Sequence, residues 1–333
     1  MAETKRIIEC VPNFSEGCDM QKVKSIADAI SGVSGVKVLN IDSGEAANRT
    51  VITFAGEPEA VCEAAFQAVA QAAKVIDMRE QHGVHPRIGA TDVLPLVPVS
   101  GVTLAECVEM SRKLARRIAD ELRIPCYCYE SAAFKPERRN LAVCRTGEYE
   151  GLARRMTEPD QQPDYGARPW DEDLSKTGCT VVGARDFLIA VNFNLNSTSK
   201  KLASDIAAEV RQSGRHGKPG TLKDVKAIGW YIEEYGIAQV SMNITNINVT
   251  PLHKAFDEVS RAAEARGARV TGTEIIGLIP KRVLLEAGEY YLRKQGAKTD
   301  VSESEMMKIA IKSMSLDDLK PFDPKKKIIE FLL

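Results

Sequence analysis

Residues 49–77, RTVITFAGEPEAVCEAAFQAVAQAAKVID, join a strand pattern to a helix pattern. The first eight residues are rich in β-branched and aromatic side chains, which favours a strand. Pro58 opens an Ala-rich segment that predicts a long helix, because proline is tolerated in a helix's first turn. Outward from this stretch, the chain has strand patterns at residues 6–12, 36–42 and 92–99, and a helix pattern at 20–32. The order is strand, helix, strand, strand, helix, strand.

The same order recurs in the second half of the chain. Strand patterns lie at residues 186–195, 225–233, 237–245 and 268–279, and helix patterns at 199–214 and 252–267. Two successive split β-α-β units, the ferredoxin-like arrangement, are the most economical interpretation. The sequence therefore predicts the α/β class, an α+β sandwich of two ferredoxin-like subdomains.

The segments between the two units set the domain boundary. They comprise a helix at 104–123, a strand at 124–130, a short helix at 147–156 and a Pro-, Gly- and Asp-rich loop at 157–178. We place an N-terminal subdomain at 1–180, a C-terminal subdomain at 181–298 and a helical appendage at 299–333. We expect the apolar end of the appendage to dock on the body or on a neighbouring subunit. A chain of 333 residues suits two domains, since single cores usually stop growing near ~250 residues.

Composition excludes some partners. Hydrophobic residues make up 44% and charged residues 27%, as in ordinary globular proteins, and the net charge of -1 gives no field that would gather nucleic acid or an anionic membrane. No apolar run approaches the ~18 residues of a membrane span. The N-terminus lacks the apolar core of a signal peptide, so we expect a cytoplasmic protein with eight reduced cysteines. Alternation places Cys126 and Cys128 on one face of a strand as small core residues.

Two loops of the first half and one of the second carry polar side chains suited to binding. ECVPNFSEG, residues 9–17, presents Asn13, and DSGEAANRT, residues 42–50, presents Asp42 and Arg49. A capped turn and an ordinary hairpin explain these loops equally well. The stretch at 211–226, RQSGRHGKPGTLKDVK, has five basic residues and one acid; Lys218 and Lys223 are among the basic ones. This stretch is suited to binding anionic ligands, and it is equally typical of an ordinary solvent-exposed surface loop.

HGVHPRIGATDV, residues 82–93, contains two of the chain's four histidines. Gly83 and Pro86 make a helix unfavourable here, and no Glu neighbours the first histidine, so a zinc site is not indicated. No Gly-x-Ser-x-Gly marks a nucleophile. A histidine with a pKa of roughly 6.5 suits general acid–base work, and Arg87 could orient a carboxylate with its planar fork. A purely structural role for the histidine remains an alternative.

Together, several motifs resemble the formiminotransferase domain of glutamate formimidoyltransferases. They follow that family's order over about residues 6–290, and ECVPNFSEG and the HPR-x-GA pattern at 85–90 are the most specific. The others are NRTVITFAGEPEAV, GEYEGL, PDYG, TVVGARDFLIAVNFNL, AIGWYIEEYGIAQVSMNITN and TGTEIIGLIP. The animal member of the family continues into a cyclodeaminase domain, for which this chain ends too soon, so it resembles a stand-alone transferase.

The resemblance implies a reaction and a site. It implies a dimer with an electropositive cleft or tunnel between the halves, which moves the formimino group from N-formimino-L-glutamate to N5 of tetrahydrofolate, the co-substrate. No metal is needed. His85 matches the family's catalytic base and His82 is incidental, while Asp42 matches an acid of the cleft. The family's folate segment maps onto 166–178, with these residues as folate contacts: Gly166, Ala167, Arg168, Thr177 and Gly178.

Carboxylates of the substrate and of the polyglutamylated folate tail need further partners. Candidates are Asn13, Arg49, Arg87, Lys218 and Lys223. A separate cyclodeaminase is a further possible partner. Two alternatives stay open: a glutamate formyltransferase that uses N-formylglutamate, and a non-catalytic folate-binding protein.

Overall fold

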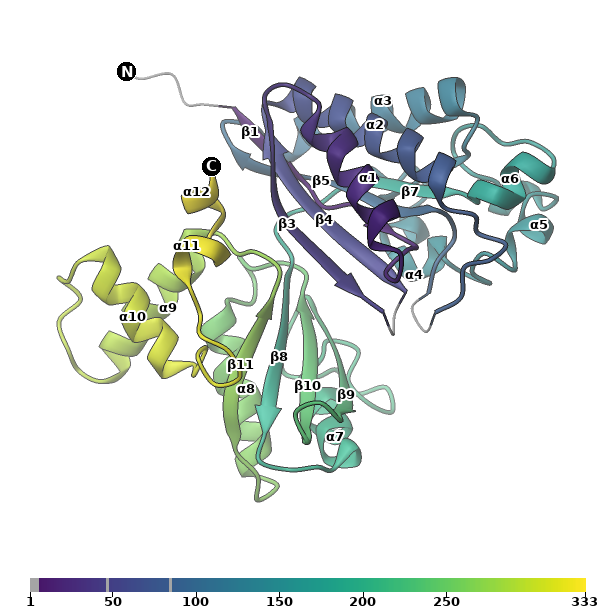
Figure 1. The fold of residues 1–333 in the computed structure, drawn as a ribbon. Coiled ribbons are helices and arrows are strands. Elements are labelled where there is room, and N and C mark those ends of the chain that lie inside the picture. Colours follow the sequence, from purple (N-terminus) through teal and green to yellow (C-terminus); the bar gives the residue numbers. More distant parts are fainter. Residues whose placement is uncertain (1–5, 46–47, 84–85) are drawn as a thin grey trace. The chain divides into compact units, whose positions relative to one another are not determined.

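The structure is a computed structural model that describes residues 6–45, 48–83 and 86–333 (Figure 1). The chain forms two compact units, one reaching to Asp186 and the other spanning Phe187–Leu332. A seven-stranded sheet lies in the first unit and a separate four-stranded sheet in the second, with helices interleaved along the chain. The predicted fold class, an α+β architecture of two subdomains, is confirmed.

The sheet of the first unit contains a ferredoxin-like core with two added strands. Its strand order is β3, β4, β1 with β2, β5, β7 and β6. The interrupted strand β1–β2 lies antiparallel between β4 and β5, as the central strand of a split β-α-β unit does. Strand β7 extends the sheet parallel to β5 and to β6. The bounds are β1 (Ile7–Cys10), β2 (Asn13–Phe14), β3 (Val36–Gly44), β4 (Arg49–Gly56), β5 (Thr91–Ser100), β6 (Cys126–Glu130) and β7 (Thr180–Ala184).

Helices cover one face of this sheet, and short helical turns cover part of the other. Helices α1 (Met20–Ser31), α2 (Pro58–Val75) and α3 (Leu104–Leu122) lie together on one face (Figure 1). Local signals begin them as expected: Asp19 caps α1, Pro58 opens α2, and Thr103 with Glu106 forms a capping box on α3. The same face holds Cys126 and Cys128, whereas Tyr127 contributes to a second core on the opposite face. The predicted alternation of the two cysteines is therefore confirmed.

Two local predictions for residues 147–178 need correction. The expected helix at 147–156 forms only one turn, α5 (Leu152–Arg155), because Gly147 and Glu148 adopt positive φ angles of 75° and 53°. The expected loop at 157–178 ends in a helix, α6 (Glu172–Thr177). The Asp171 carboxylate accepts a hydrogen bond from the Leu174 N–H, and two acids fill the first turn, so this acidic stretch stabilises a helix N-terminus. The remaining turns are a 3-10 turn at Pro136–Arg139, α4 (Leu141–Cys144) and a 3-10 turn at Pro159–Gln161.

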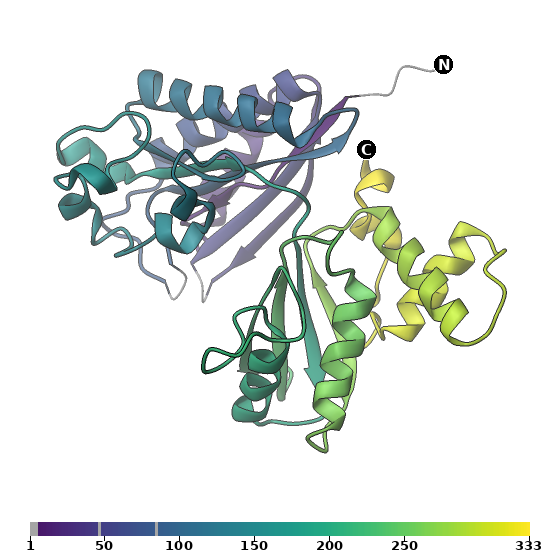
Figure 2. The same cartoon turned by 180° about the vertical axis from the view of Figure 1, so that it is seen from behind.

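The second unit has a ferredoxin-like sheet with strand order β11, β8, β10, β9, antiparallel throughout. Its strands are β8 (Ile189–Leu195), β9 (Val225–Ile232), β10 (Ile237–Ile244) and β11 (Val270–Ile276). Helices α7 (Lys200–Val210) and α8 (Leu252–Glu264) lie over one face and are seen in front of the sheet in Figure 2. Helices α9 (Lys281–Lys294), α10 (Glu303–Ser313), α11 (Pro324–Lys327) and α12 (Ile329–Leu332) follow.

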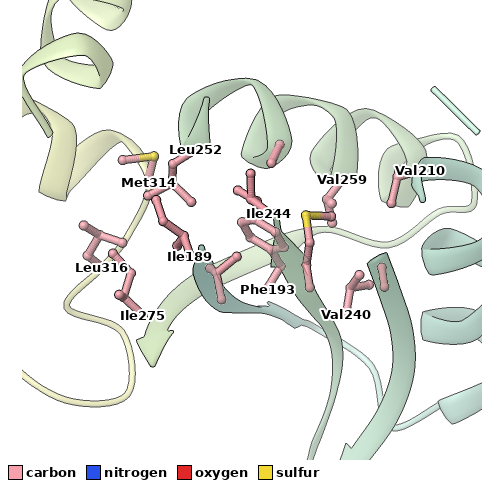
Figure 3. Close-up of a cluster of buried hydrophobic side chains, with 14 of the residues drawn as sticks. Ile189, Phe193, Val210, Val240, Ile244, Leu252, Val259, Ile275, Met314 and Leu316 are labelled. Atoms are coloured by element: carbon pink, nitrogen blue, oxygen red, sulfur yellow. The ribbon is translucent and has the colours of Figure 1, made fainter. Parts of the chain in front are cut away.

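The C-terminal helices share the core of the second unit. Met314 and Leu316, beyond α10, lie beside Ile189 and Ile275 of the sheet (Figure 3). Met307, Ala310 and Ile328 belong to the same buried cluster. The segment at 299–333 is thus part of the packing of this unit. Among the described residues, no helix combines the length and apolarity needed to cross a membrane.

Candidate active site

Four motifs of the first unit meet around residues 81–92, beginning with the acid of ECVPNFSEG. Glu16 is buried, and its Oε1 accepts hydrogen bonds from the Cys18 and Asp19 N–H groups, both at 2.9 Å. Its Oε2 accepts from Gln81 Nε2 at 3.2 Å and lies 3.5 Å from Lys22 Nζ. Since a buried carboxylate is costly unless hydrogen-bonded, Glu16 fixes the side chain of Gln81, the residue before the histidine segment.

Asn48 connects the β3–β4 hairpin to the same segment. Its backbone has a φ of 45°, which asparagine tolerates better than most residues. The side-chain Oδ1 accepts from the Gly17 N–H at 2.9 Å. Nδ2 donates to Gln81 Oε1 at 2.6 Å and to the His82 carbonyl oxygen at 2.9 Å. Asn48 therefore holds the N-terminal flank of the histidine segment through its backbone.

Arg87 holds the C-terminal flank and is bound by the GEYEGL motif. The buried guanidinium donates through Nη2 to the Gln81 carbonyl and to Glu150 Oε1, both at 2.8 Å. Glu148 Oε2 lies 3.5 Å from Nη1. Partial burial opposes ionisation of Glu150, but Arg87 outweighs this and holds the pKa of that carboxyl below its ordinary value. Arg87 Nε is buried and has no partner within the described part of the chain, so one donor remains for a ligand.

Asp92, at the start of β5, is the fully buried charge of this region. Its carboxylate pairs with Arg49 Nη1 at 2.7 Å and with Arg145 Nη2, and accepts from the Ile88 N–H at 3.0 Å. Burial alone would raise the pKa of Asp92, but the two arginines outweigh it and keep that pKa below its ordinary value. Arg49 Nε also donates to Asn13 Oδ1 at 2.9 Å. The structure thus brings together the predicted residues Asn13 and Arg49, both engaged by the protein itself.

Two glycines place the end of the segment at 166–178 against the histidine segment. Gly178 faces Gly89, with the Ala90 N–H donating to the Thr177 carbonyl at 2.8 Å and the Cys179 N–H to the Ile88 carbonyl at 2.9 Å. Gly178 has a φ of 65°, and a Cβ there would lie 2.3 Å from the Ile88 oxygen. A Cβ on Gly89 would lie 2.1 Å from the Cys179 oxygen. Only glycines permit this approach.

The rest of the segment at 166–178 lies at the C-terminal ends of α2 and α3. Gly166 packs there, since a Cβ on it would lie 2.9 Å from that of Ala119. Arg168 donates to Asp171 Oδ1 at 2.9 Å, while its Nε and Nη1 are buried without a partner among the described residues. A cavity of about 250 Å³ adjoins it, lined by Ala73, Leu122, Arg123, Arg168, Asp173, Lys176 and Thr177. Three of these residues are cationic and one is acidic, which favours an anionic ligand.

Other predicted residues lie apart from this network. Asp42 is exposed on β3, opposite Val51 of β4. The His82 side chain is exposed. Lys218 and Lys223 are exposed in the second unit, where Lys218 closes a tight turn through mutual backbone hydrogen bonds with Arg215, both at 3.0 Å. His85, predicted as the catalytic base, lies outside the described residues. Ala167, between Gly166 and Arg168, is exposed.

Sequence reasoning missed the partners of the predicted residues. Glu150 and Asp92 bind Arg87 and Arg49, and neither acid was a candidate. Asp92 did leave a signal, because a single acid opening the apolar run TDVLPLVPV must find a cation if that strand is buried. Over the ranges that the structure describes, no group of three or more His, Cys, Asp or Glu side chains is arranged to hold a metal ion.

Comparison with known proteins covers both units. The N-terminal subdomain of the formiminotransferase domain matches residues 7–185, and the formiminotransferase domain matches residues 190–333. Glutamate formimidoyltransferase of Streptococcus pyogenes is 43% identical over 86% of this chain and 94% of its own length. The enzyme of that name from Thermoplasma acidophilum is 38% identical over 91% of this chain and 98% of its own.

Longer relatives match as well. Formimidoyltransferase-cyclodeaminase of Gallus gallus is 44% identical over 98% of this chain, and the chain spans 60% of the length of that relative. The resemblance seen in the motifs is thereby confirmed across both units. The chain belongs to the formiminotransferase domain family.

Proposed function

We propose that this protein transfers the formimino group from N-formimino-L-glutamate to N5 of tetrahydrofolate, giving 5-formiminotetrahydrofolate and L-glutamate. The observation that carries the proposal is the family match over both units, together with 43% identity to a protein named glutamate formimidoyltransferase over 94% of its length. The buried polar network around residues 81–92 supports it, because it supplies a rigid frame for one acid–base group.

The chemistry needs one proton carrier. N5 forms a bond to the formimino carbon and loses a proton, and the bond from that carbon to the glutamate nitrogen breaks as this nitrogen gains a proton. One group that accepts and then returns the proton suffices, which suits a histidine near neutral pH. We assign this role to His85. Asn48 holds the backbone at His82 and Glu150 holds Arg87, so hydrogen bonds fix residues on either side of His85.

Binding roles follow from which groups remain available. Arg87 has an Nε donor without a partner in the described part of the chain, and Lys218 and Lys223 are exposed. We therefore assign these three residues to binding the carboxylates of the substrate and of the folate tail. Arg49 and Asn13 are engaged around Asp92, so we assign them to holding the frame. We assign the folate to the segment Gly166–Gly178 and to Asp42, with Arg168 as an anion-binding group of the segment.

Association and location complete the proposal. We propose a homodimer, as the family resemblance implies, which light scattering on the purified protein would test. All eight cysteines are free thiols, which suits the reducing cytoplasm. The names of the longer relatives support a cyclodeaminase as the partner that consumes the product.

The test is a steady-state assay with purified protein and tetrahydrofolate, with formiminoglutamate and formylglutamate as alternative donors. We expect kcat/KM for formiminoglutamate to exceed that for formylglutamate by more than ~10², and mass spectrometry to identify the formimino product. A preference for formylglutamate would make the protein a formyltransferase. Tetrahydrofolate binding without turnover of either donor would make it a folate-binding protein.

A further inference from the structure

The cavity of the first unit, which we call the α6 cavity, lies where the C-terminal ends of α2 and α3 meet α6 (Figure 1). Its volume of about 250 Å³ is below the roughly 300–1,000 Å³ of pockets for drug-sized ligands, so it suits a small ligand rather than a whole folate. Three of its lining side chains are cationic, those of Arg123, Arg168 and Lys176, and one, that of Asp173, is acidic. Three cations and one acid leave an excess of two positive charges, which favours a dianion.

Arg168 is the lining residue with the clearest need for a further partner. Its side chain is 15% exposed, and Nη2 pairs at 2.9 Å with Asp171, whose side chain is 47% exposed. The Nε and Nη1 atoms are buried and have no partner among the residues that the structure describes. Buried donors of a charged group are costly unless they are hydrogen-bonded, so Arg168 favours an acceptor supplied by a ligand.

The local structure allows Arg168 to turn toward such a ligand. The Asp171 carboxylate also accepts from the Leu174 N–H at 2.9 Å, so it continues to cap α6 when the guanidinium rotates away from it. Arg123 follows the last turn of α3, and its exposed side chain has no ion pair within the described ranges. Two guanidinium groups are therefore available to an anion in the cavity.

The lining residues of α6 are also bonded to both ends of the stretch 78–90, which contains the histidine segment. The Met78 N–H donates to the Lys176 carbonyl, and the Ala90 N–H donates to the Thr177 carbonyl, both at 2.8 Å. An anion bound to the side chain of Lys176 stabilises the closed form of α6, because α6 then opens only after the anion is released. The two backbone hydrogen bonds are stabilised with it.

We propose that the α6 cavity binds a small phosphate-type dianion through Arg168, Arg123 and Lys176, and that this binding stabilises both ends of the stretch 78–90. The inference goes beyond the proposed function, because this anion is neither a substrate nor a product of the transfer. A tetrahedral dianion matches the excess of positive charge, and its oxygens accept charge-assisted hydrogen bonds from several donors at once.

Isothermal titration calorimetry of the full chain with inorganic phosphate tests the site, with sodium chloride used to keep the ionic strength constant. We expect saturable binding to the wild type. Arg168→Met should weaken the phosphate affinity at least about tenfold, since it removes charge-assisted hydrogen bonds. The matched control is Arg116→Met on α3, where the arginine side chain is 72% exposed and lies 3.7 Å from Asp120. This control should leave the phosphate affinity unchanged.

Hydrogen exchange followed by mass spectrometry tests the effect on the stretch 78–90. Phosphate should slow exchange in peptides that contain Met78 or Ala90 in the wild type, and should not do so in Arg168→Met. The comparison of the two proteins is needed because phosphate also stabilises folded proteins by exclusion from their surface. Should Arg168→Met not fold, Arg168→Lys replaces it, since lysine keeps the charge and loses the planar fork.

Three outcomes would overturn the site: no saturable heat with phosphate, equal phosphate affinity in wild type and Arg168→Met, or displacement of phosphate by p-aminobenzoylglutamate, which would give the cavity to the folate tail. Phosphate binding without slower exchange at Met78 and Ala90 would overturn the effect on the stretch 78–90. None of these measurements needs turnover. A protein that binds phosphate as expected but transfers no formimino group would therefore refute the proposed function and support the anion site.

Discussion

The variant Asp92→Asn tests the frame of the candidate active site. Asparagine keeps the size of the side chain and an acceptor for the Ile88 N–H but removes the charge. Arg49 and Arg145 would then face each other in a buried setting without their shared carboxylate. Removing one partner of a buried ion pair costs about 3–5 kcal/mol, because the remaining charge is left uncompensated.

We expect the lower end of that range, about 3 kcal/mol, because the amide still accepts hydrogen bonds. In a unit of this size, 1 kcal/mol shifts Tm by roughly 2–4 °C, so Tm should fall by roughly 6–12 °C. The measurement is urea unfolding followed by circular dichroism, with calorimetry for Tm. Glu63→Gln is the matched control: it removes a carboxylate 2.5 Å from Arg117, but both side chains are more than a third exposed. Such surface pairs are worth about 0.2–1 kcal/mol.

The double variant Asp92→Asn with Arg49→Met separates two costs. One is the lost attraction between carboxylate and guanidinium, and the other is the burial of a cation without a partner. Removing the cation should recover part of the lost stability, since a matched apolar side chain can replace a buried pair without great loss. A loss of less than about 1 kcal/mol in Asp92→Asn, similar to that of Glu63→Gln, would contradict the reasoning. So would a double variant that is less stable than the single one.

The pH dependence of stability gives an independent check. The folded-state pKa of Asp92 is lower than the unfolded value of about 3.9, so its contribution is complete above that value and is lost as the pH falls through the folded pKa. The stability difference between wild type and Asp92→Asn should therefore be constant from pH 5 to 8, and should shrink only below about pH 4. A difference that shrinks near pH 6 would show that another group titrates.

Other variants test single residues of the candidate site. His85→Ala should lower turnover by ~10²–10⁴ with tetrahydrofolate affinity retained. His82→Ala should change turnover by less than about tenfold, since the hydrogen bond that Asn48 donates to His82 is accepted by the backbone oxygen, which the variant keeps. The double change Lys218→Ala and Lys223→Ala should weaken the binding of folylpolyglutamate more than the binding of a folate analogue without glutamate. Equal losses of affinity for the two ligands in calorimetry would show that this loop is an ordinary solvent-exposed loop without a binding role. Gly178→Ala should lower the unfolding free energy by at least ~1–3 kcal/mol, because its φ is positive and its Cβ would lie 2.3 Å from a backbone oxygen; an unchanged urea midpoint would contradict this.

The repeated order of strands and helices was predictable because each element has its own periodicity. Strands β8, β9, β10 and β11 and their helices have the predicted order, and the antiparallel pairing follows from the split β-α-β pattern. The parallel addition of β7 to β5 was not predictable, since nothing in an isolated strand specifies its neighbour. Helix α6 was missed because its Gly- and Pro-rich surroundings hide a capping Asp171.

Site residues were predictable by type but not by partner. Arg49 and Arg87 were recognised as cations suited to carboxylates, and both bind carboxylates, but these belong to the protein. Glu150 lies 63 positions from Arg87, and local sequence does not distinguish it from the many other acids. Burial determines which acid pairs with each arginine, because a desolvated arginine must find a negative charge within the fold.

A hydrogen-bonded row of side chains in the second unit shows how core packing and a distant residue together specify one arrangement: Trp230 donates to Gln239, Gln239 to Asn194, and Asn194 to Asp318. In IAVNFNL of β8, the alternation of apolar and amide residues determines which face each side chain occupies. A slip of one residue would turn Asn194 and Asn192 into the helix-covered core and expel Phe193 and Val191, so the apolar residues fix where the amides lie. The direction of their hydrogen bonds is set elsewhere, because Asp318, 124 positions after Asn194, accepts only and so orients the amides toward itself. The strand sequence therefore places the row, and the C-terminal segment determines the direction of its hydrogen bonds.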